Sequence, residues 1–279
     1  MTFLERMAAA SRKRVERARA AESDAKLARR AARRAQPPPL ELAEFDVIAE
    51  LKLRSPAAGG LAESGFDRGA QLDAYARGGA AAVSVLTEPS EFKGELAHLV
   101  DAAALLAPRL RPVMRKDFVT DPYQVLEARA AGAGGILVIV TMLDDPTVRV
   151  LVDSARECGL FVLLEAFDRA DLERLAPFDA AQATGPPLLA GVNCRDLKSL
   201  NVRFERFAEL APYLPRHLPT VAESGIGTTD DVATVAKLGY RLALIGSSLM
   251  RAADPAAALA ALVAAGRAAS APGAAKRER

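Results

Sequence analysis

Residues 111–140 read RPVMRKDFVTDPYQVLEARAAGAGGILVIV, and this stretch contains one complete unit of the pattern that decides the fold. Asp121 suits the N-cap of a helix and Pro122 its first helical position, while Gly132 suits the position just after the helix end. The apolar run 135–140 that follows is nearly continuous, as is typical of a parallel strand covered on both faces. The stretch therefore predicts a strand, a helix and a second strand in succession.

The same unit repeats along most of the 279-residue chain. Apolar runs of β type begin near residues 47, 81, 112, 135, 160, 188, 219 and 242. Each run but the sixth is followed by a clear helical stretch, and the sixth helix, near 204–211, is short. The regular repeat predicts an α/β protein with a single (β/α)8 TIM barrel. A doubly wound open sheet is the rival, but its first strand normally leads into a glycine-rich loop, which is absent here.

The chain outside the repeat is helical and basic. Residues 2–35 contain no Gly or Pro and indicate one or two helices, which the prolines at 37–39 stop. We therefore predict an N-terminal helical extension over residues 1–44 that packs on the barrel, the barrel itself over 45–265, and a basic, flexible tail over 266–279.

Charge and composition narrow the class of protein. The formal net charge is +2, with positive charge gathered in the N-terminal and C-terminal segments. In the N-terminal segment Lys and Arg are interleaved with Ala and Glu, which indicates a solvated helix face rather than a nucleic-acid site or a transit peptide. No apolar run is long enough to span a bilayer. Cys158 and Cys194 show no metal-ligand spacing. These features predict a cytoplasmic protein with no metal site, no membrane contact and no nucleic-acid partner.

Polar residues close the C-terminal ends of the apolar runs. In a (β/α)8 barrel all these strand ends meet on one face, where enzymes of this fold build their sites. We interpret the residues as one catalytic site rather than as separate salt bridges at the barrel rim. They are Glu50 and Lys52 after the first run, Lys116 after the third, Glu165 after the fifth, Asn193 after the sixth, and Glu223 with Ser224 after the seventh.

The residue types indicate acid–base chemistry. Lys116, shielded among carboxylates, can act as a general acid or as an electrostatic clamp. Glu165 ends the most apolar strand, a setting that suits a carboxyl group for proton transfer. Glu50 and Lys52 alternate along their strand, so both project to the same side. Asn193 can donate or accept a hydrogen bond at a substrate hydroxyl.

Two glycine-containing loops predict a phosphate site. Gly225 follows the seventh run, and Gly246 with Ser247 follows the eighth. In barrels these two loops commonly bind phosphate through backbone N–H groups and the start of a short helix. Lys52 and Ser55 are placed to join them across the barrel closure. We therefore expect a small, anionic, phosphorylated substrate.

Five motifs carry a family resemblance. Together, in chain order, they resemble indole-3-glycerol phosphate synthase of tryptophan biosynthesis, and the Phe-x-Gly loop at 92–94 fits the same family. The resemblance implies a carboxy-lyase that closes the ring of 1-(2-carboxyphenylamino)-1-deoxyribulose 5-phosphate, with loss of carbon dioxide and water and with no cofactor. The motifs are IAELKLRSP at 48–56, SVLT at 84–87, RKDF at 115–118, GVNCRDL at 191–197 and AESGI at 222–226.

The resemblance also implies catalytic roles. Lys116 would be the general acid of the condensation. Glu165 would serve the dehydration, with Lys52 as a second proton carrier. Glu50 would orient Lys52 and the substrate, and the N-terminal extension would form a partial lid.

Binding roles follow in the same way. Asn193 and Glu223 would hold the sugar hydroxyls, and Phe118 would border the anthranilate ring. The phosphate would be held by Ser55, Gly225, Gly246 and Ser247, with Arg195 and Ser224 completing the predicted binding set.

Four positions depart from the family pattern, and they leave room for a divergent paralogue with the same chemistry: Leu53, Ala57, Glu95 and Cys194. Phosphoribosylanthranilate isomerase is a rival that typically uses a Cys–Asp pair at strand ends, and no strand end here carries one. A barrel that has lost activity and binds a phosphate ligand or a partner protein is a third alternative. We further expect a monomer or weak homodimer, with other tryptophan-pathway enzymes as candidate partners.

Overall fold

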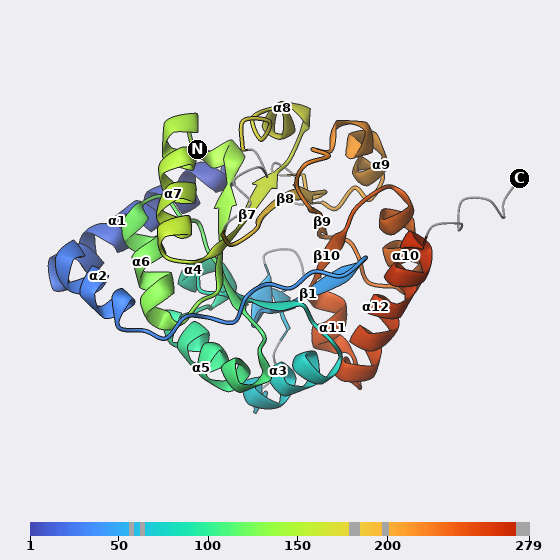
Figure 1. Ribbon diagram of the computed structural model, residues 1–279, viewed down its shortest axis with the longest axis horizontal. Coiled ribbons are helices and arrows are strands. Elements are labelled where there is room, and N and C mark those ends of the chain that lie inside the picture. The colour runs from blue at the N-terminus through green and yellow to red at the C-terminus, as the bar shows by residue number, and fades with distance from the viewer. Residues whose placement is uncertain (56–58, 62–64, 179–184, 197–200, 272–279) are drawn as a thin grey trace, which may run out of the picture.

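A closed barrel of parallel strands forms the centre of the molecule (Figure 1). The computed structural model describes residues 1–55, 59–61, 65–178, 185–196 and 201–271. Neighbouring strands follow the order β1-β10-β9-β8-β7-β6-β5-β4, and β1 pairs with both β10 and β4, which closes the barrel. The predicted (β/α)8 architecture is confirmed. The strands are β1 (Asp46–Leu51), β4 (Ala82–Leu86), β5 (Val113–Lys116), β6 (Gly135–Ile139), β7 (Phe161–Ala166), β8 (Leu188–Asn193), β9 (Thr220–Glu223) and β10 (Leu242–Ile245).

Helices surround the barrel and follow the strands in turn (Figure 1). The predicted start and end of the helix that begins at Pro122 are confirmed. At its start the Asp121 side chain accepts the backbone N–H of Tyr123, and just after its end Gly132 has a φ of 93°. The small strands β2 (Arg54–Ser55) and β3 (Gly59–Gly60) form a separate antiparallel pair after β1. The helices are α3 (Arg68–Arg77), α4 (Pro89–Phe92), α5 (Leu96–Leu106), α6 (Pro122–Ala131), α7 (Asp145–Glu157), α8 (Arg169–Glu173), α9 (Arg206–Leu210), α10 (Thr229–Lys237), α11 (Ser247–Arg251) and α12 (Pro255–Ser270), with 3-10 turns η1 (Ala107–Arg109), η2 (Val140–Met142) and η3 (Ala211–Tyr213).

Alternation along the strands divides the core into two layers. One layer lies between the strands and the surrounding helices. The other fills the barrel and continues into the N-terminal helix, so the barrel interior and that helix share one apolar cluster. The inner cluster includes Ile48, Met114, Leu137, Leu163, Leu189, Val221 and Leu244 from the strands, with Leu4 and Met7 from the N-terminal helix.

The N-terminal extension consists of α1 (Phe3–Ala21) and α2 (Asp24–Ala32), which lie on one flank of the barrel beside α6 (Figure 1). Thr2 and Glu5 form a capping box at the start of α1. Buried Leu27 of α2 packs in a cluster with Tyr123 of α6. The extension is therefore packed on the barrel through apolar contacts as well as polar ones.

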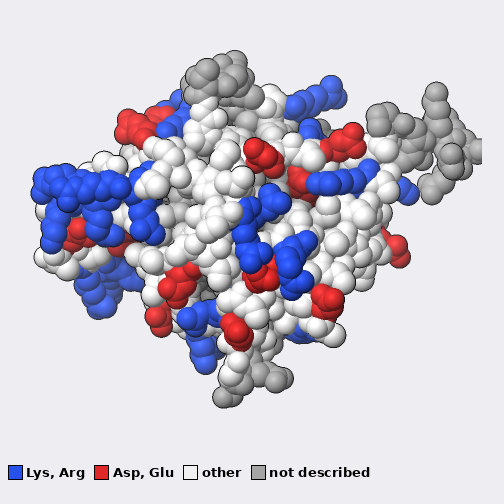
Figure 2. Space-filling model, turned by 60° about the horizontal axis from the view of Figure 1, so that its bottom comes forward, with Lys and Arg blue, Asp and Glu red and all other residues white. Residues whose placement is uncertain are grey.

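Positive charge gathers at the end of the molecule that α1 and α2 form (Figure 2). Some arginines in this region form ion pairs, such as Arg30 with Glu22 at 2.7 Å. Among the described residues, no helix combines the length and apolar character needed to cross a bilayer. The exposed basic residues of the two helices are Arg6, Arg12, Lys13, Arg17, Arg19, Lys26, Arg29 and Arg30, and Arg33 and Arg34 follow directly after α2.

The last helix extends past the boundary that the sequence predicted at residue 265. α12 continues to Ser270, so residues 266–270 belong to the barrel rather than to a tail. Arg267 pairs with Asp46 at 2.9 Å. A Cβ atom on Gly266 would lie 2.1 Å from Cδ1 of Phe45, so only glycine allows α12 to approach the base of β1 this closely.

Gly266→Ala should destabilise the protein although alanine is the better helix former. The helix-propensity gain of about 1 kcal/mol is smaller than the overpacking cost of roughly 1–3 kcal/mol. Urea unfolding should therefore give a lower free energy of unfolding. Ala264→Gly on the exposed face of α12 provides the calibration, since it loses propensity without a clash. A stabilised Gly266→Ala protein would show that α12 does not pack on Phe45 as described.

Candidate active site

The polar residues that the sequence singled out lie together at the C-terminal ends of the strands. Two adjoining pockets open there. One lies over β5, β6 and β7, and the other lies over β8, β9 and β10. The two pockets share six lining residues, so they form one continuous depression. The shared residues are Glu50, Lys52, Lys116, Asn193, Arg195 and Ser224.

Two lysines and three carboxylates form the centre of this depression. Lys116 Nζ lies 2.9 Å from Glu165 Oε2 and 3.4 Å from Glu223 Oε2. Lys52 Nζ lies 2.7 Å from Glu50 Oε1. All five side chains are mostly buried. Buried charges are stable only when they are paired, so this arrangement fixes each group against its partner.

The carboxylates determine the protonation of Lys116. Burial alone would lower the pKa of Lys116, but the carboxylates of Glu165, Glu223 and Glu50 raise it well above its usual value. Burial would likewise raise the pKa of Glu50, but the ammonium groups of Lys52 and Lys116 lower it. Lys116 is therefore a cation, and Glu50 an anion, across the physiological pH range.

Glu223 behaves differently from the other carboxyls. Burial raises the pKa of Glu223 well above its usual value, and the nearby carboxylate of Glu165 raises it further. Neither of its oxygens has a hydrogen-bond partner among the described residues. A Cβ atom on Gly191 would lie 2.2 Å from Glu223 Oε1, so the glycine in β8 makes the space for this carboxyl. The two oxygens of Glu223 are thus available to bond a ligand.

Asn193 lines both pockets. Its Oδ1 accepts the backbone N–H of Arg195 at 3.0 Å. Because the backbone already occupies this oxygen, we expect the amide NH2 group to be the part that donates to a ligand.

The pocket wall beside Lys116 is apolar. The Phe118 ring, which the sequence predicted there, lies 6.0 Å from the Phe3 ring and 6.4 Å from the Phe92 ring, measured between centroids. Leu4 and Phe167 also line this side. Such a wall suits a flat aromatic ring. The motif at 92–94 hinted at Phe92, whereas no sequence pattern indicated Phe3 or Leu4.

Small residues line the opposite side of the depression. Gly225 and Ser224 have φ values of 75° and 71°, and the left-handed conformation is strained for serine. The Cys194 thiol donates to the Ser224 carbonyl oxygen at 3.2 Å and holds this turn. The remaining lining residues here include Gly227, Gly246, Ser247, Ser248 and Arg251.

Two residues of this small-residue side do more than the sequence indicated. A Cβ atom on Gly246 would lie 2.7 Å from Glu50 Oε1, so Gly246 also makes room for the Glu50–Lys52 pair. The Ser248 hydroxyl is buried without a hydrogen-bond partner among the described residues. Ser248 belongs to the loop that the sequence predicted to bind phosphate, although the predicted set of binding residues did not include it. The side chain of Ser55 lies outside the described part of the structure.

The positions that depart from the family pattern lie mostly away from the reacting groups. Glu95 is exposed and lines neither pocket. Cys194 is buried behind Ser224. Leu53 is half-buried, and Ala57 lies outside the described residues. Within the described ranges, no three His, Cys, Asp or Glu side chains are grouped so that they could hold a metal ion.

Comparison with known sequences finds close relatives. A family model described as indole-3-glycerol phosphate synthase matches residues 4–262. The indole-3-glycerol phosphate synthase of Nocardioides sp. is 45% identical over 218 residues, which are 78% of this chain and 80% of that protein. The protein of the same name from Parafrankia sp. is 43% identical and covers 81% of each chain. That from Mycolicibacterium smegmatis is 39% identical and covers 84% of each.

Two solved structures share the fold at low sequence identity. The 3-hexulose-6-phosphate synthase of Salmonella typhimurium has a TM-score of 0.60 at 15% identity and covers 81% of this chain and 100% of its own. Thiamine phosphate pyrophosphorylase of Pyrococcus furiosus has a TM-score of 0.56 at 13% identity, covering 82% and 98%. Identities this low show a shared barrel fold and nothing about activity.

Glu223→Gln should stabilise the protein at neutral pH. Because the folded state raises the pKa of Glu223, stability falls as pH rises from the usual carboxyl value of 4.5, where the unfolded chain loses its proton. Glutamine removes this dependence. We expect a Tm increase of about 2–4 °C at pH 7.5 that disappears near pH 4, measured by calorimetry. A variant less stable than wild type at pH 7.5 would contradict the raised pKa.

Proposed function

The chain belongs to the indole-3-glycerol phosphate synthase family, and from this premise we propose that it converts 1-(2-carboxyphenylamino)-1-deoxyribulose 5-phosphate into indole-3-glycerol phosphate. The observation that carries the proposal is the position of Lys116, held between Glu165 and Glu223 and opening onto both pockets. An aromatic ring fits the apolar wall on one side, and a phosphate fits the glycine and serine loops on the other.

The proposed reaction joins two parts of one molecule. The ring carbon that bears the carboxylate attacks the ketone carbon, and the ketone oxygen takes up a proton to become a hydroxyl. The bond from the ring to the carboxylate then breaks, carbon dioxide leaves, and its electron pair restores the aromatic ring. Finally the hydroxyl takes a second proton and leaves as water, while the neighbouring carbon gives up a proton to form the indole double bond. No step needs an external oxidant or reductant, and side chains can carry the protons that move, so we expect no cofactor.

Lys116 supplies the first proton in this proposal. Its pKa is raised by the surrounding carboxylates, yet it can still protonate the ketone oxygen because a developing alkoxide is far more basic than an amine. Before transfer, the ammonium also stabilises the negative charge that grows on the oxygen. A neutral Lys116 beside Glu165 would be unfavourable, so the lysine is promptly protonated again.

The groups around Lys116 carry the protons of the dehydration step. Glu165, 2.9 Å from Lys116, can accept the proton that the substrate carbon releases. Lys52 is the second candidate for delivering a proton to the leaving hydroxyl, and Glu50 holds its ammonium at 2.7 Å. The Glu50–Lys52 ion pair fits here because Gly246 has no side chain to occupy the space.

Binding is divided between the two ends of the site. Asn193 donates to one sugar hydroxyl, and the carboxyl of Glu223 bonds another. Phe118 borders the ring. We propose that the buried hydroxyl of Ser248 joins the residues predicted to bind the phosphate. Those residues are Ser55, Gly225, Gly246 and Ser247, and the same pocket is also lined by Arg195, Ser224 and Arg251.

The setting of the reaction is also part of the proposal. A substrate that carries both a phosphate and a carboxylate does not diffuse across membranes, which favours the cytoplasm as the location. A monomer or weak homodimer, and contacts with other tryptophan-pathway enzymes, remain predictions that size-exclusion chromatography and co-purification can test.

Lys116→Ala should abolish formation of a product with indole fluorescence. Loss of a general acid and of its charge should lower kcat by at least about a hundredfold. Far-UV circular dichroism checks that the barrel is intact. Lys26→Ala, in the exposed part of α2, is the matched control and should keep wild-type activity. Turnover close to that of wild type in Lys116→Ala would contradict the proposed mechanism.

Asn193→Asp should lower kcat/KM because it replaces the amide donor with a second acceptor. We expect a loss of about tenfold to a hundredfold, from one lost neutral hydrogen bond together with repulsion between the new carboxylate and the anionic substrate. Asn193→Ser, which keeps a donor, should lose less. The orientation of Asn193 is wrong if the aspartate variant is the more active of the two in the same steady-state assay.

A further inference from the structure

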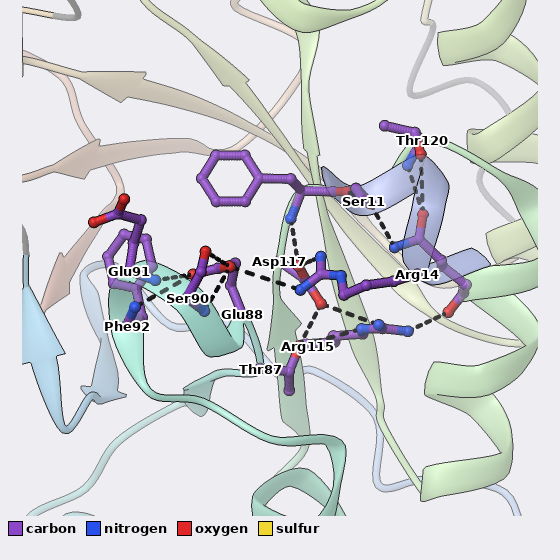
Figure 3. A network of polar contacts seen from close by, with 12 residues as sticks. Ser11, Arg14, Thr87, Glu88, Ser90, Glu91, Phe92, Arg115, Asp117 and Thr120 are labelled. Carbon is purple, nitrogen blue, oxygen red and sulfur yellow. Dashed lines mark hydrogen bonds and ion pairs between the residues drawn. The ribbon is translucent and has the colours of Figure 1, made fainter. Parts of the chain in front are cut away.

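Arg14 of α1 reaches the loops that follow two neighbouring barrel strands. Its Nη2 lies 2.6 Å from Asp117 Oδ1, just after β5, and its Nη1 lies 3.9 Å from Glu88 Oε1, just after β4 (Figure 3). The Arg14 side chain is about a quarter exposed, whereas the side chains of Asp117 and Glu88 are almost fully buried. One cation from the N-terminal extension thus joins two buried anions of the barrel.

Each of these anions fixes an aromatic residue of the pocket wall. Asp117 Oδ1 accepts the backbone N–H of Phe118 at 2.8 Å. Glu88 accepts the backbone N–H groups of the short helix α4, including that of its last residue, Phe92, at 3.3 Å (Figure 3). Arg14 therefore contacts the two carboxylates that hold the backbone of Phe118 and Phe92.

Arg14 also fixes the helix that supplies the third ring. α1 begins at Phe3, whose ring meets Phe118 edge to face. A second contact supports the same placement, since the Ser11 hydroxyl donates to the Phe118 carbonyl oxygen at 2.5 Å. Because an α-helix is stiff over this length, holding α1 at Ser11 and Arg14 sets the position of Phe3.

The remaining partners of Asp117 make the barrel side of this contact rigid. The Thr87 hydroxyl donates to Asp117 Oδ2 at 2.7 Å, and Arg115 Nη2 donates to the same oxygen at 3.0 Å. Removing Arg14 leaves these bonds in place. The loss is then confined to α1 and to its contact with the two loops.

We propose that Arg14 is a positioning residue that sets the aromatic wall of the substrate site by tying α1 to the loops after β4 and β5. The proposal rests on the proposed function for its kinetic consequence. Arg14 touches no reacting atom, so its loss weakens binding of the aromatic half of the substrate in ground state and transition state alike. Such a change raises KM and leaves kcat nearly unaltered.

Arg14→Met tests this, because methionine keeps the apolar stem and removes the guanidinium. We expect KM to rise about tenfold while kcat changes by less than about threefold. Inhibition by inorganic phosphate, which probes the other end of the site, should be unchanged. Arg14→Lys keeps a cation opposite Asp117 and should return KM to within about threefold of wild type. The control is Arg17→Met, an exposed arginine on the same helix.

Hydrogen–deuterium exchange gives a readout that does not depend on turnover. Backbone amides of α1 should exchange about tenfold faster in Arg14→Met than in Arg17→Met, because the helix opens more often. An unchanged KM in Arg14→Met, or an equal rise in Arg17→Met, overturns the proposal. If wild type forms no indole product, the proposed function fails, and the exchange rates alone decide the role of Arg14: equal rates in the two variants refute it.

Discussion

The site depends on one buried cation, Lys116, that is shared by carboxylates from different strands. Charges removed from water must be paired, and a barrel is one of few folds that brings several strand ends within bonding distance of one point. Space for the pairing comes from two glycines. Gly191 leaves room for Glu223, and Gly246 leaves room for Glu50. The charge pairs of the site can therefore form only where glycine leaves space for the carboxyl groups.

The end of β5 serves two structures at once. Successive side chains of a strand point to opposite faces, so Lys116 faces the barrel mouth while Arg115 and Asp117 face outward. Outward, Arg115 bonds Asp117 and Glu127, and Asp117 bonds Arg14 of α1. Three charged residues in a row thus connect the proton-transfer centre to the helix that closes the apolar wall.

Much of the barrel and of its polar centre could be predicted from sequence, because strand ends in a parallel barrel must meet. The apolar run at 135–140 and the capping residues around the helix from Pro122 are local sequence signals, and the structure has a strand and a helix where they predicted them. Phe3 and Arg14 could not be predicted, since nothing local indicates where a helix docks on a distant loop. The raised pKa of Glu223 depends on the space beside Gly191, and the extent of α12 depends on its contact with Phe45; neither has a sequence pattern.

The most direct test of the account uses substrate labelled with carbon-13 in its carboxyl group. Purified protein, with no added cofactor, should release one labelled carbon dioxide for each molecule of indole product formed. A product that retains the label, or turnover that releases no carbon dioxide, would contradict the proposal that this lysine–carboxylate centre carries out a decarboxylative ring closure.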